Sequence, residues 1–158
     1  MVEQKSSSID EILNEARRAL DFQFDVQDGL DTKSGILLGI AGVVITLMVT
    51  ALIGTPSLLD RIMSVIIVFV FFMSLLLSYR NIRIRDWQKP PDIEALIKEY
   101  EHEDAHITKC RLAGTIQDAI KKNETILKKR IRLFKYSYNL LFIGLVMLVV
   151  ALIILAFE

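Results

Sequence analysis

Residues 102 to 106 have the types and spacing that could bind zinc. They read His-Glu-Asp-Ala-His, the H-E-x-x-H pattern of zinc metalloproteases. In those enzymes the two histidines bind the metal from one helix face and the glutamate acts as general base. Cys110 follows at the same helical spacing. His102, His106 and Cys110 could therefore form a three-ligand face.

Other features of the chain argue against a protease. No third histidine is present in the sequence, and Asp104 places a charge inside the motif. A protease also needs a cleft that excludes water and orients a peptide, and the segments outside the apolar blocks are too short to build one. We interpret the motif as a charged helix face. We expect no catalytic residue, no metal and no cofactor, with a membrane zinc metalloprotease as an alternative.

Three uncharged apolar blocks dominate the chain, at residues 35–54, 62–79 and 138–157. They contain 20, 18 and 20 residues, and a helix rising about 1.5 Å per residue then crosses a hydrocarbon layer about 30 Å thick. The mean hydropathy of +0.42 agrees with a membrane protein. We predict an all-α integral membrane fold, in which three transmembrane helices extend into a cytoplasmic helical bundle.

The positions of lysine and arginine predict the orientation. Residues 1–34 carry 4 of them, residues 55–61 carry 1, and residues 80–137 carry 14. Short loops rich in these cations stay in the cytoplasm. We expect a multi-pass plasma-membrane protein with an N-terminal amphipathic helix (1–34) and a helical region (80–137) in the cytoplasm, and the C-terminus outside. Cys110 would then be a reduced thiol.

The two cytoplasmic parts carry complementary charge stripes. A capping box at Ser8 predicts where the N-terminal helix begins, and acids then recur on it every three or four residues. Two readings stay open: the acidic and basic stripes pair inside a bundle, or both face solvent. The basic end could also attract anionic lipid headgroups. Counted back from their spans, the matching residues are Asp25, Asp28 and Asp31 on one helix and Lys128, Arg132 and Lys135 on the other.

The first span carries small residues along one helix face. Small residues let helix backbones approach closely in lipid. The face could pack against the other spans of the same chain, or it could pack between subunits and line an opening. The spans contain no Asp, Glu, Lys, Arg or His, which disfavours ion-coupled transport. The stripe consists of Gly35, Gly39, Gly42, Thr46 and Thr50, and the expected interfacial aromatics are Tyr79, Trp87, Tyr136 and Tyr138.

Two stretches resemble a known family. "DTKSGILLGIAG" at residues 31–42 and "QDAIKKNETILKKRIRLFKYSYNLLFIGLVML" at residues 117–148 are similar to the Pycsar transmembrane effectors of anti-phage signalling and the related SLATT proteins. The resemblance implies an oligomer that impairs the inner membrane when a nucleotide signal is made. Asp31 and Lys33 are the positions that match at the membrane junction. The chain departs from the best-known arrangement in its third span and in lacking a recognisable cyclic-nucleotide-binding domain.

We therefore predict a non-enzymatic oligomeric membrane protein, an effector that perturbs or permeabilises the inner membrane in response to a signal. The alternative is a membrane-anchored scaffold that docks a cytoplasmic partner through its helical bundle. The expected partners are the lipid bilayer, further copies of the chain and a separate cytoplasmic sensor or signalling protein. We expect no nucleic-acid duplex among them.

Overall fold

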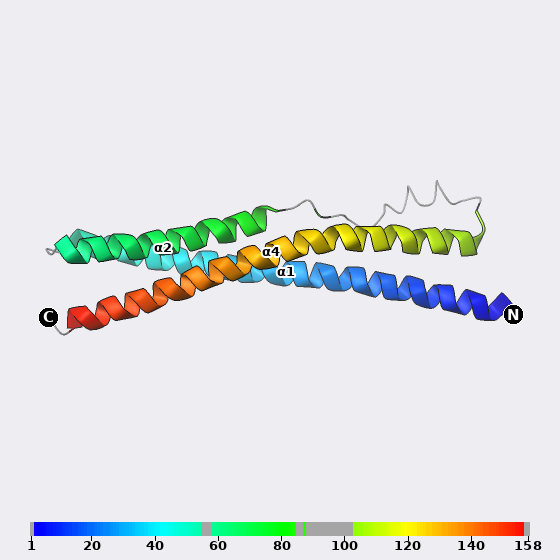
Figure 1. The fold of residues 1–158 in the computed structure, drawn as a ribbon, viewed down its shortest axis with the longest axis horizontal. Coiled ribbons are helices and arrows are strands. Elements are labelled where there is room, and N and C mark those ends of the chain that lie inside the picture. The colour runs from blue at the N-terminus through cyan, green and yellow to red at the C-terminus, as the bar shows by residue number, and fades with distance from the viewer. Residues whose placement is uncertain (1, 55–57, 85–86, 88–102, 157–158) are drawn as a thin grey trace. The chain divides into compact units, whose positions relative to one another are not determined.

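The described part of the chain forms three long helices (Figure 1). The computed structural model describes the backbone of residues 2–54, 58–84, 87 and 103–156, and the side chains of residues 8–50, 58–84, 87 and 103–154. The helices are α1 (Val2–Gly54), α2 (Leu58–Arg83) and α4 (Ala105–Ala156). Within these ranges there is no strand. The all-α prediction is confirmed.

All three helices are long and apolar enough to cross a membrane. Their most apolar 18-residue windows have mean hydropathies of 1.9, 2.6 and 2.5, and only 17–22% of each window is buried inside the protein. Most of this apolar surface therefore faces outward. Lipid covers such a surface without the cost that water would impose. The protein is an all-α multi-pass membrane protein.

The chain divides into two compact units, which we treat separately. The membrane unit comprises residues 29–85 and 129–158, and the extramembrane unit comprises residues 1–28 and 86–128. α1 and α4 each contribute to both units, whereas α2 belongs to the membrane unit. The helix ends do not mark where the lipid begins, so the span limits of 35–54, 62–79 and 138–157 stay a prediction.

α1 starts earlier than its sequence indicates. The helix begins at Val2, six residues before Ser8, so the prediction of an N-cap at Ser8 is wrong. The residues that follow Val2 include Glu3, Gln4 and Lys5, which are good helix formers and extend the helix past the capping box.

α4 begins with a cap that lies inside the zinc-type motif. The backbone N–H of His106 donates to Oδ1 of Asp104 at 2.8 Å, and the N–H of Thr108 donates to the carbonyl oxygen of Asp104 at 3.0 Å. Asp104 therefore satisfies free amides of the first turn, as aspartate does at N-caps. The helix starts at Ala105 because of this cap.

The core of the membrane unit joins all three helices. Its buried residues are Leu37 and Ala41 on α1, Ile67 and Phe71 on α2, and Leu141 on α4. The side chain of Phe71 is fully buried. The helices thus pack around one apolar centre while their other faces stay open to lipid.

The extramembrane unit has a core of its own between α1 and α4. Leu13 and Leu20 pack with Ala113 and Ile116. Polar contacts fix the register: Nε2 of Gln23 donates to the carbonyl oxygen of Ile120 at 3.1 Å. An ion pair also joins Lys109 to Asp10 at 2.6 Å, and the ring of Trp87 contacts that of Phe24 with centroids 5.9 Å apart.

Candidate functional site

A buried arginine is the central feature of the membrane unit. Arg130 on α4 is 1% exposed, and its Nη2 forms an ion pair with Asp31 on α1. The carboxylate of Asp31 is 39% exposed, so water reaches the acid and not the base. A guanidinium removed from water needs a charged partner and further acceptors. Arg130 has both, because its Nε donates to Oδ1 of Asn81 at 3.3 Å.

Asn81 extends this contact to a third side chain. It lies on α2, is fully buried, and its Nδ2 donates to Oγ of Ser34 on α1 at 2.8 Å. Asp31, Ser34, Asn81 and Arg130 together form what we call the junction network. It joins all three helices at the end of the unit where α2 finishes and where the apolar parts of α1 and α4 begin.

A serine cluster lies further along the same helices. Ser137 of α4 donates to the carbonyl oxygen of Ser74 at 2.8 Å, and Ser74 donates back to the carbonyl oxygen of Ser137 at 2.8 Å. The hydroxyl of Ser78 is 2.6 Å from that of Ser137. Since the proton of Ser137 is already used, Ser78 must be the donor. These bonds hold α2 and α4 together within the membrane unit.

The predicted junction motif is split between two environments. Asp31 turns inward to Arg130, while Lys33 is exposed. The two residues therefore do different things. Asp31 neutralises a buried charge, and Lys33 remains available at the surface.

The charge stripes meet differently from the predicted pairing. Asp31 contacts Arg130 and not Lys135, and Lys128 pairs with Glu124 on its own helix at 2.6 Å. A hydrogen bond from Lys128 and its charge lower the pKa of Glu124. In the described part of the chain the remaining members are exposed and enter no ion pair; they are Asp25, Asp28, Arg132 and Lys135.

The reason is a register difference of about one helical turn. Counting back from the apolar blocks placed Asp31 near residue 134, but the observed partner is residue 130. Four residues correspond to about 6 Å along a helix. The first residues of the apolar blocks of α1 and α4 do not lie at the same level in the helix bundle. Ser137, just before the third block, is already buried against α2.

The small-residue stripe of α1 faces away from the rest of the chain. Gly35, Gly39, Thr46 and Thr50 are exposed and Gly42 is half-buried. A Cβ built at any of the three glycines would meet nothing within 4 Å. The threonine hydroxyls donate to carbonyl oxygens of their own helix at 2.9 Å. The stripe therefore does not pack against α2 or α4 of the same chain.

A different glycine makes the close contact inside the unit. Gly144 of α4 is buried, and a Cβ there would lie 2.9 Å from Cε2 of Phe71. The sequence analysis missed Gly144, Asn81, Ser34 and Arg130. A seven-residue spacing could have found the α4 members, because buried positions recur at 116, 123, 130, 137 and 144.

The zinc-type motif does not lie on one helix face. Glu103 and Asp104 precede α4, and His102 lies outside the described residues. Glu103 forms an ion pair with Arg111 at 2.7 Å. Sγ of Cys110 is 3.9 Å from Nδ1 of His106, and both side chains are exposed. Among the described residues no three His, Cys, Asp or Glu side chains gather around a point that could hold a metal.

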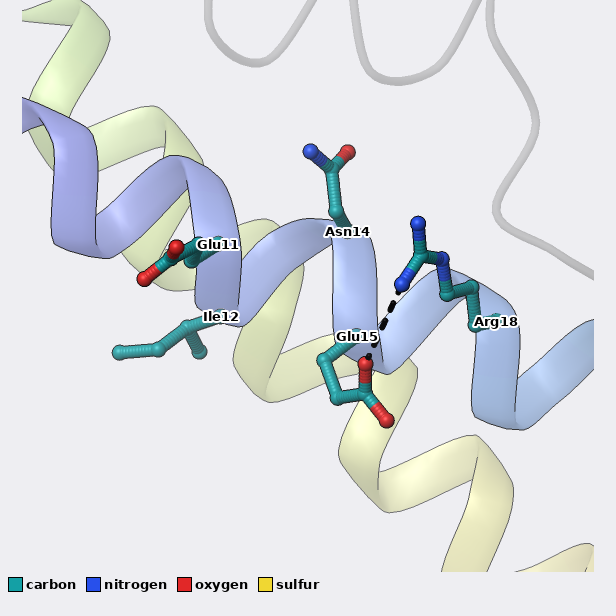
Figure 2. A pocket seen from close by; sticks show the side chains of 5 residues that line it. All are labelled: Glu11, Ile12, Asn14, Glu15 and Arg18. Atoms are coloured by element: carbon teal, nitrogen blue, oxygen red, sulfur yellow. Dashed lines mark ion pairs between the residues drawn. The ribbon is translucent and has the colours of Figure 1, made fainter.

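The described residues of the extramembrane unit form at least two hollows. Figure 2 shows that the described side chains lining the first come from α1, with an exposed ion pair between Glu15 and Arg18 at 3.9 Å. The second is a groove of about 650 Å³ between α1 and α4. Its walls are mainly apolar and small, and include Ile12, Ala16 and Ala113. Neither hollow has the convergent polar groups of an active site.

The chain matches the model of a known protein family. A family model described as the Pycsar effector protein domain matches residues 15–157. The matched range contains the whole junction network, the serine cluster and the small-residue stripe. No curated protein and no solved structure matches the chain.

Proposed function

The chain belongs to the Pycsar effector family, and we propose that this anti-phage membrane effector acts as an oligomer that permeabilises the inner membrane when a signal arrives. The exposed small-residue stripe carries the proposal. It lies on the face of α1 opposite the buried Leu37 and Ala41, where the described part of the chain offers it no partner. A second copy of the chain is the partner that such a face fits best.

The chemistry of lipid supports this choice. Apolar surface gains nothing by leaving lipid for another apolar surface, so helices associate there through close backbone packing. Gly39 has an open surface that admits another backbone. The hydroxyls of Thr46 and Thr50 donate to carbonyl oxygens of their own helix, so exposing this face to lipid costs little free energy before copies of the chain associate.

The predicted spans favour a passive opening over coupled transport. Residues 35–54, 62–79 and 138–157 contain no Asp, Glu, Lys, Arg or His. Proton relays and ion-coupled carriers depend on such groups within the bilayer. The effector would therefore dissipate gradients and not use them. A separate cytoplasmic protein would sense the signal.

We propose that the N-terminus and residues 80–137 face the cytoplasm and that the C-terminus faces outward. Cys110 is the single cysteine of the chain and is exposed on α4. An impermeant maleimide should label it only after cells are permeabilised. In the matched variant Cys110→Ser/Leu58→Cys, the thiol moves to the exposed first residue of α2 and should be labelled in intact cells. The opposite pattern would reverse the orientation.

Barrier loss in cells tests the permeabilising function. Dye entry and membrane potential are measured for the wild type, Gly39→Leu and Leu47→Phe at matched membrane levels, with phage infection as the natural trigger. Leu47 is 65% exposed outside the stripe, so its variant adds bulk to α1 without blocking the stripe. We expect barrier loss for the wild type and Leu47→Phe but not for Gly39→Leu. Equal barrier loss for all three proteins would exclude a role of the stripe in permeabilisation. An intact barrier for all three would exclude permeabilisation itself.

The groove of the extramembrane unit supports the second candidate, a scaffold for a cytoplasmic partner. Ile12 lines this groove and is 56% exposed, so Ile12→Lys changes the groove without opening a core. A scaffold should lose its partner and its anti-phage protection with this change. The permeabilising effector should keep dye entry in the same variant.

A further inference from the structure

Six exposed cations surround the junction network. They come from all three helices of the membrane unit, and none of them enters an ion pair with another described residue. We call this set the basic collar. It consists of Lys33, Arg80, Arg83, Lys129, Arg132 and Lys135.

The junction network fixes the level of the collar. Arg130 contacts both Asp31 and Asn81, so the three residues lie at one height on their three helices. Five collar residues lie within two positions of one of these three, which is about 3 Å along a helix axis. Lys135 lies five positions beyond Arg130, about 7.5 Å further along. The collar is therefore a narrow band and not a scatter of charges.

The described acidic side chains of the membrane unit do not neutralise the positive charge of the collar. The described acids of the membrane unit are Asp31 and Asp60. Asp60 lies in the first turn of α2, at the far end of that helix from the collar. Asp31 lies at the level of the collar, but its carboxylate is paired with the buried Arg130. The next acid along α1, Asp28, is exposed one turn further from the first span.

Aromatic residues mark the same band as a membrane interface. Tyr79, Tyr136 and Tyr138 are 55%, 55% and 51% exposed; Tyr79 directly precedes Arg80 on α2, and Tyr136 directly follows Lys135 on α4. Tyrosine at the surface of a membrane helix places its ring among the headgroups. The collar cations next to these rings therefore lie at headgroup height.

We propose that the basic collar binds the phosphates of anionic phospholipid headgroups, and that several such lipids surround the membrane unit. The cations point outward from three helices and do not converge on a pocket. This arrangement fits a ring of separate lipids better than one free phosphate ion. Such lipid selection goes beyond the proposed permeabilisation and requires none of its steps.

The test follows the thermal midpoint of the full chain in detergent micelles as phosphatidylglycerol is added. The collar variant carries Arg80→Gln, Arg83→Gln, Arg132→Gln and Lys135→Gln. The control variant carries Arg17→Gln, Arg18→Gln, Lys121→Gln and Lys122→Gln, which remove the same charge from exposed positions of the extramembrane unit. Each cation near an anionic surface strengthens binding about fivefold. We expect the half-saturating lipid concentration to rise more than about tenfold for the collar variant only.

Three results would overturn the proposal. They are equal half-saturation in the wild type and the collar variant, an equal effect of phosphatidylcholine, and an equal effect of inorganic phosphate without lipid. The last result would assign the collar to free anions. If the collar variant does not fold, the wild type alone still decides, because the effect of phosphatidylglycerol should shrink between low and high salt. A salt-independent effect would contradict charge-based binding. Since no permeation is measured, failure here leaves the barrier experiment unaffected.

Discussion

Replacing Asp31 with asparagine should destabilise the membrane unit, because it leaves the buried Arg130 without its counter-charge. Removing one partner of a fully buried ion pair costs about 3–5 kcal/mol. Here the carboxylate is 39% exposed, and asparagine can still accept one hydrogen bond. We therefore expect about 2 kcal/mol for Asp31→Asn, below the range for a fully buried pair. For a chain of this length that free energy lowers the midpoint by roughly 4–8 °C.

The assay is thermal unfolding of the full chain in nanodiscs of one lipid composition. Asp28→Asn is the matched control, since Asp28 lies on the same helix, is exposed and enters no ion pair in the described part of the chain. Surface changes of this kind stay within about 0.5 kcal/mol. If Asp31→Asn and Asp28→Asn have the same midpoint, the ion pair does not stabilise the unit.

A double-mutant cycle separates the ion pair from other effects. Arg130→Met removes the buried charge, so Asp31→Asn should then cost almost nothing. Arg130→Met itself leaves Oδ1 of the buried Asn81 without its donor, at a cost of about 1–3 kcal/mol. If Asp31→Asn costs as much in the Arg130→Met variant as in the wild type, the two residues are independent and our account of the network is wrong.

Three further changes test other parts of the fold. Gly144→Ala should cost about 1–3 kcal/mol in nanodisc unfolding, because its Cβ meets the immobile ring of Phe71, whereas Gly42→Ala has open space and should cost nothing; equal midpoints would contradict the close contact. Ser137→Ala should cost about 1 kcal/mol, since it leaves the Ser78 hydroxyl in lipid without its acceptor, and an unchanged midpoint would mean that the cluster finds other partners. Asp104→Ala should lower the free energy of protection against amide hydrogen exchange in the first turn of α4 by about 1 kcal/mol. Unchanged exchange would show that the cap is dispensable.

The sequence was sufficient for the fold class because block length alone decides it. An uncharged run such as residues 138–157 has one stable form in lipid, a helix. The same reasoning fails for contacts between helices. Lys128, Lys129, Arg130, Arg132 and Lys135 look alike in a list of cations, yet only Arg130 is buried. Which cation turns inward depends on how α4 is rotated against its neighbours, and hydropathy does not encode that rotation.

The seven-residue spacing does encode it. On α1 the positions 13, 20, 34 and 41 are buried, and on α2 the positions 67, 74 and 81 are buried. A repeat of seven keeps one seam of a helix against its partners. Hydropathy hides this repeat because the seam changes from apolar to polar and small along the chain. The sequence motifs therefore included Asp31, which turns inward, but they missed the buried Ser34, Asn81, Arg130 and Gly144.

Polar seam residues are what a helix bundle in lipid requires. Within lipid, apolar seam residues such as leucine would be equally well solvated outside the bundle, so they give the helices little drive to associate. A buried hydroxyl, amide or guanidinium does give such a drive, because it must find a hydrogen-bond partner once it leaves water. Ser34, Asn81, Arg130 and Ser137 therefore hold the three helices in one register. This internal pairing also leaves the basic collar and the glycine face of α1 directed outward, where lipids and further copies of the chain can meet them.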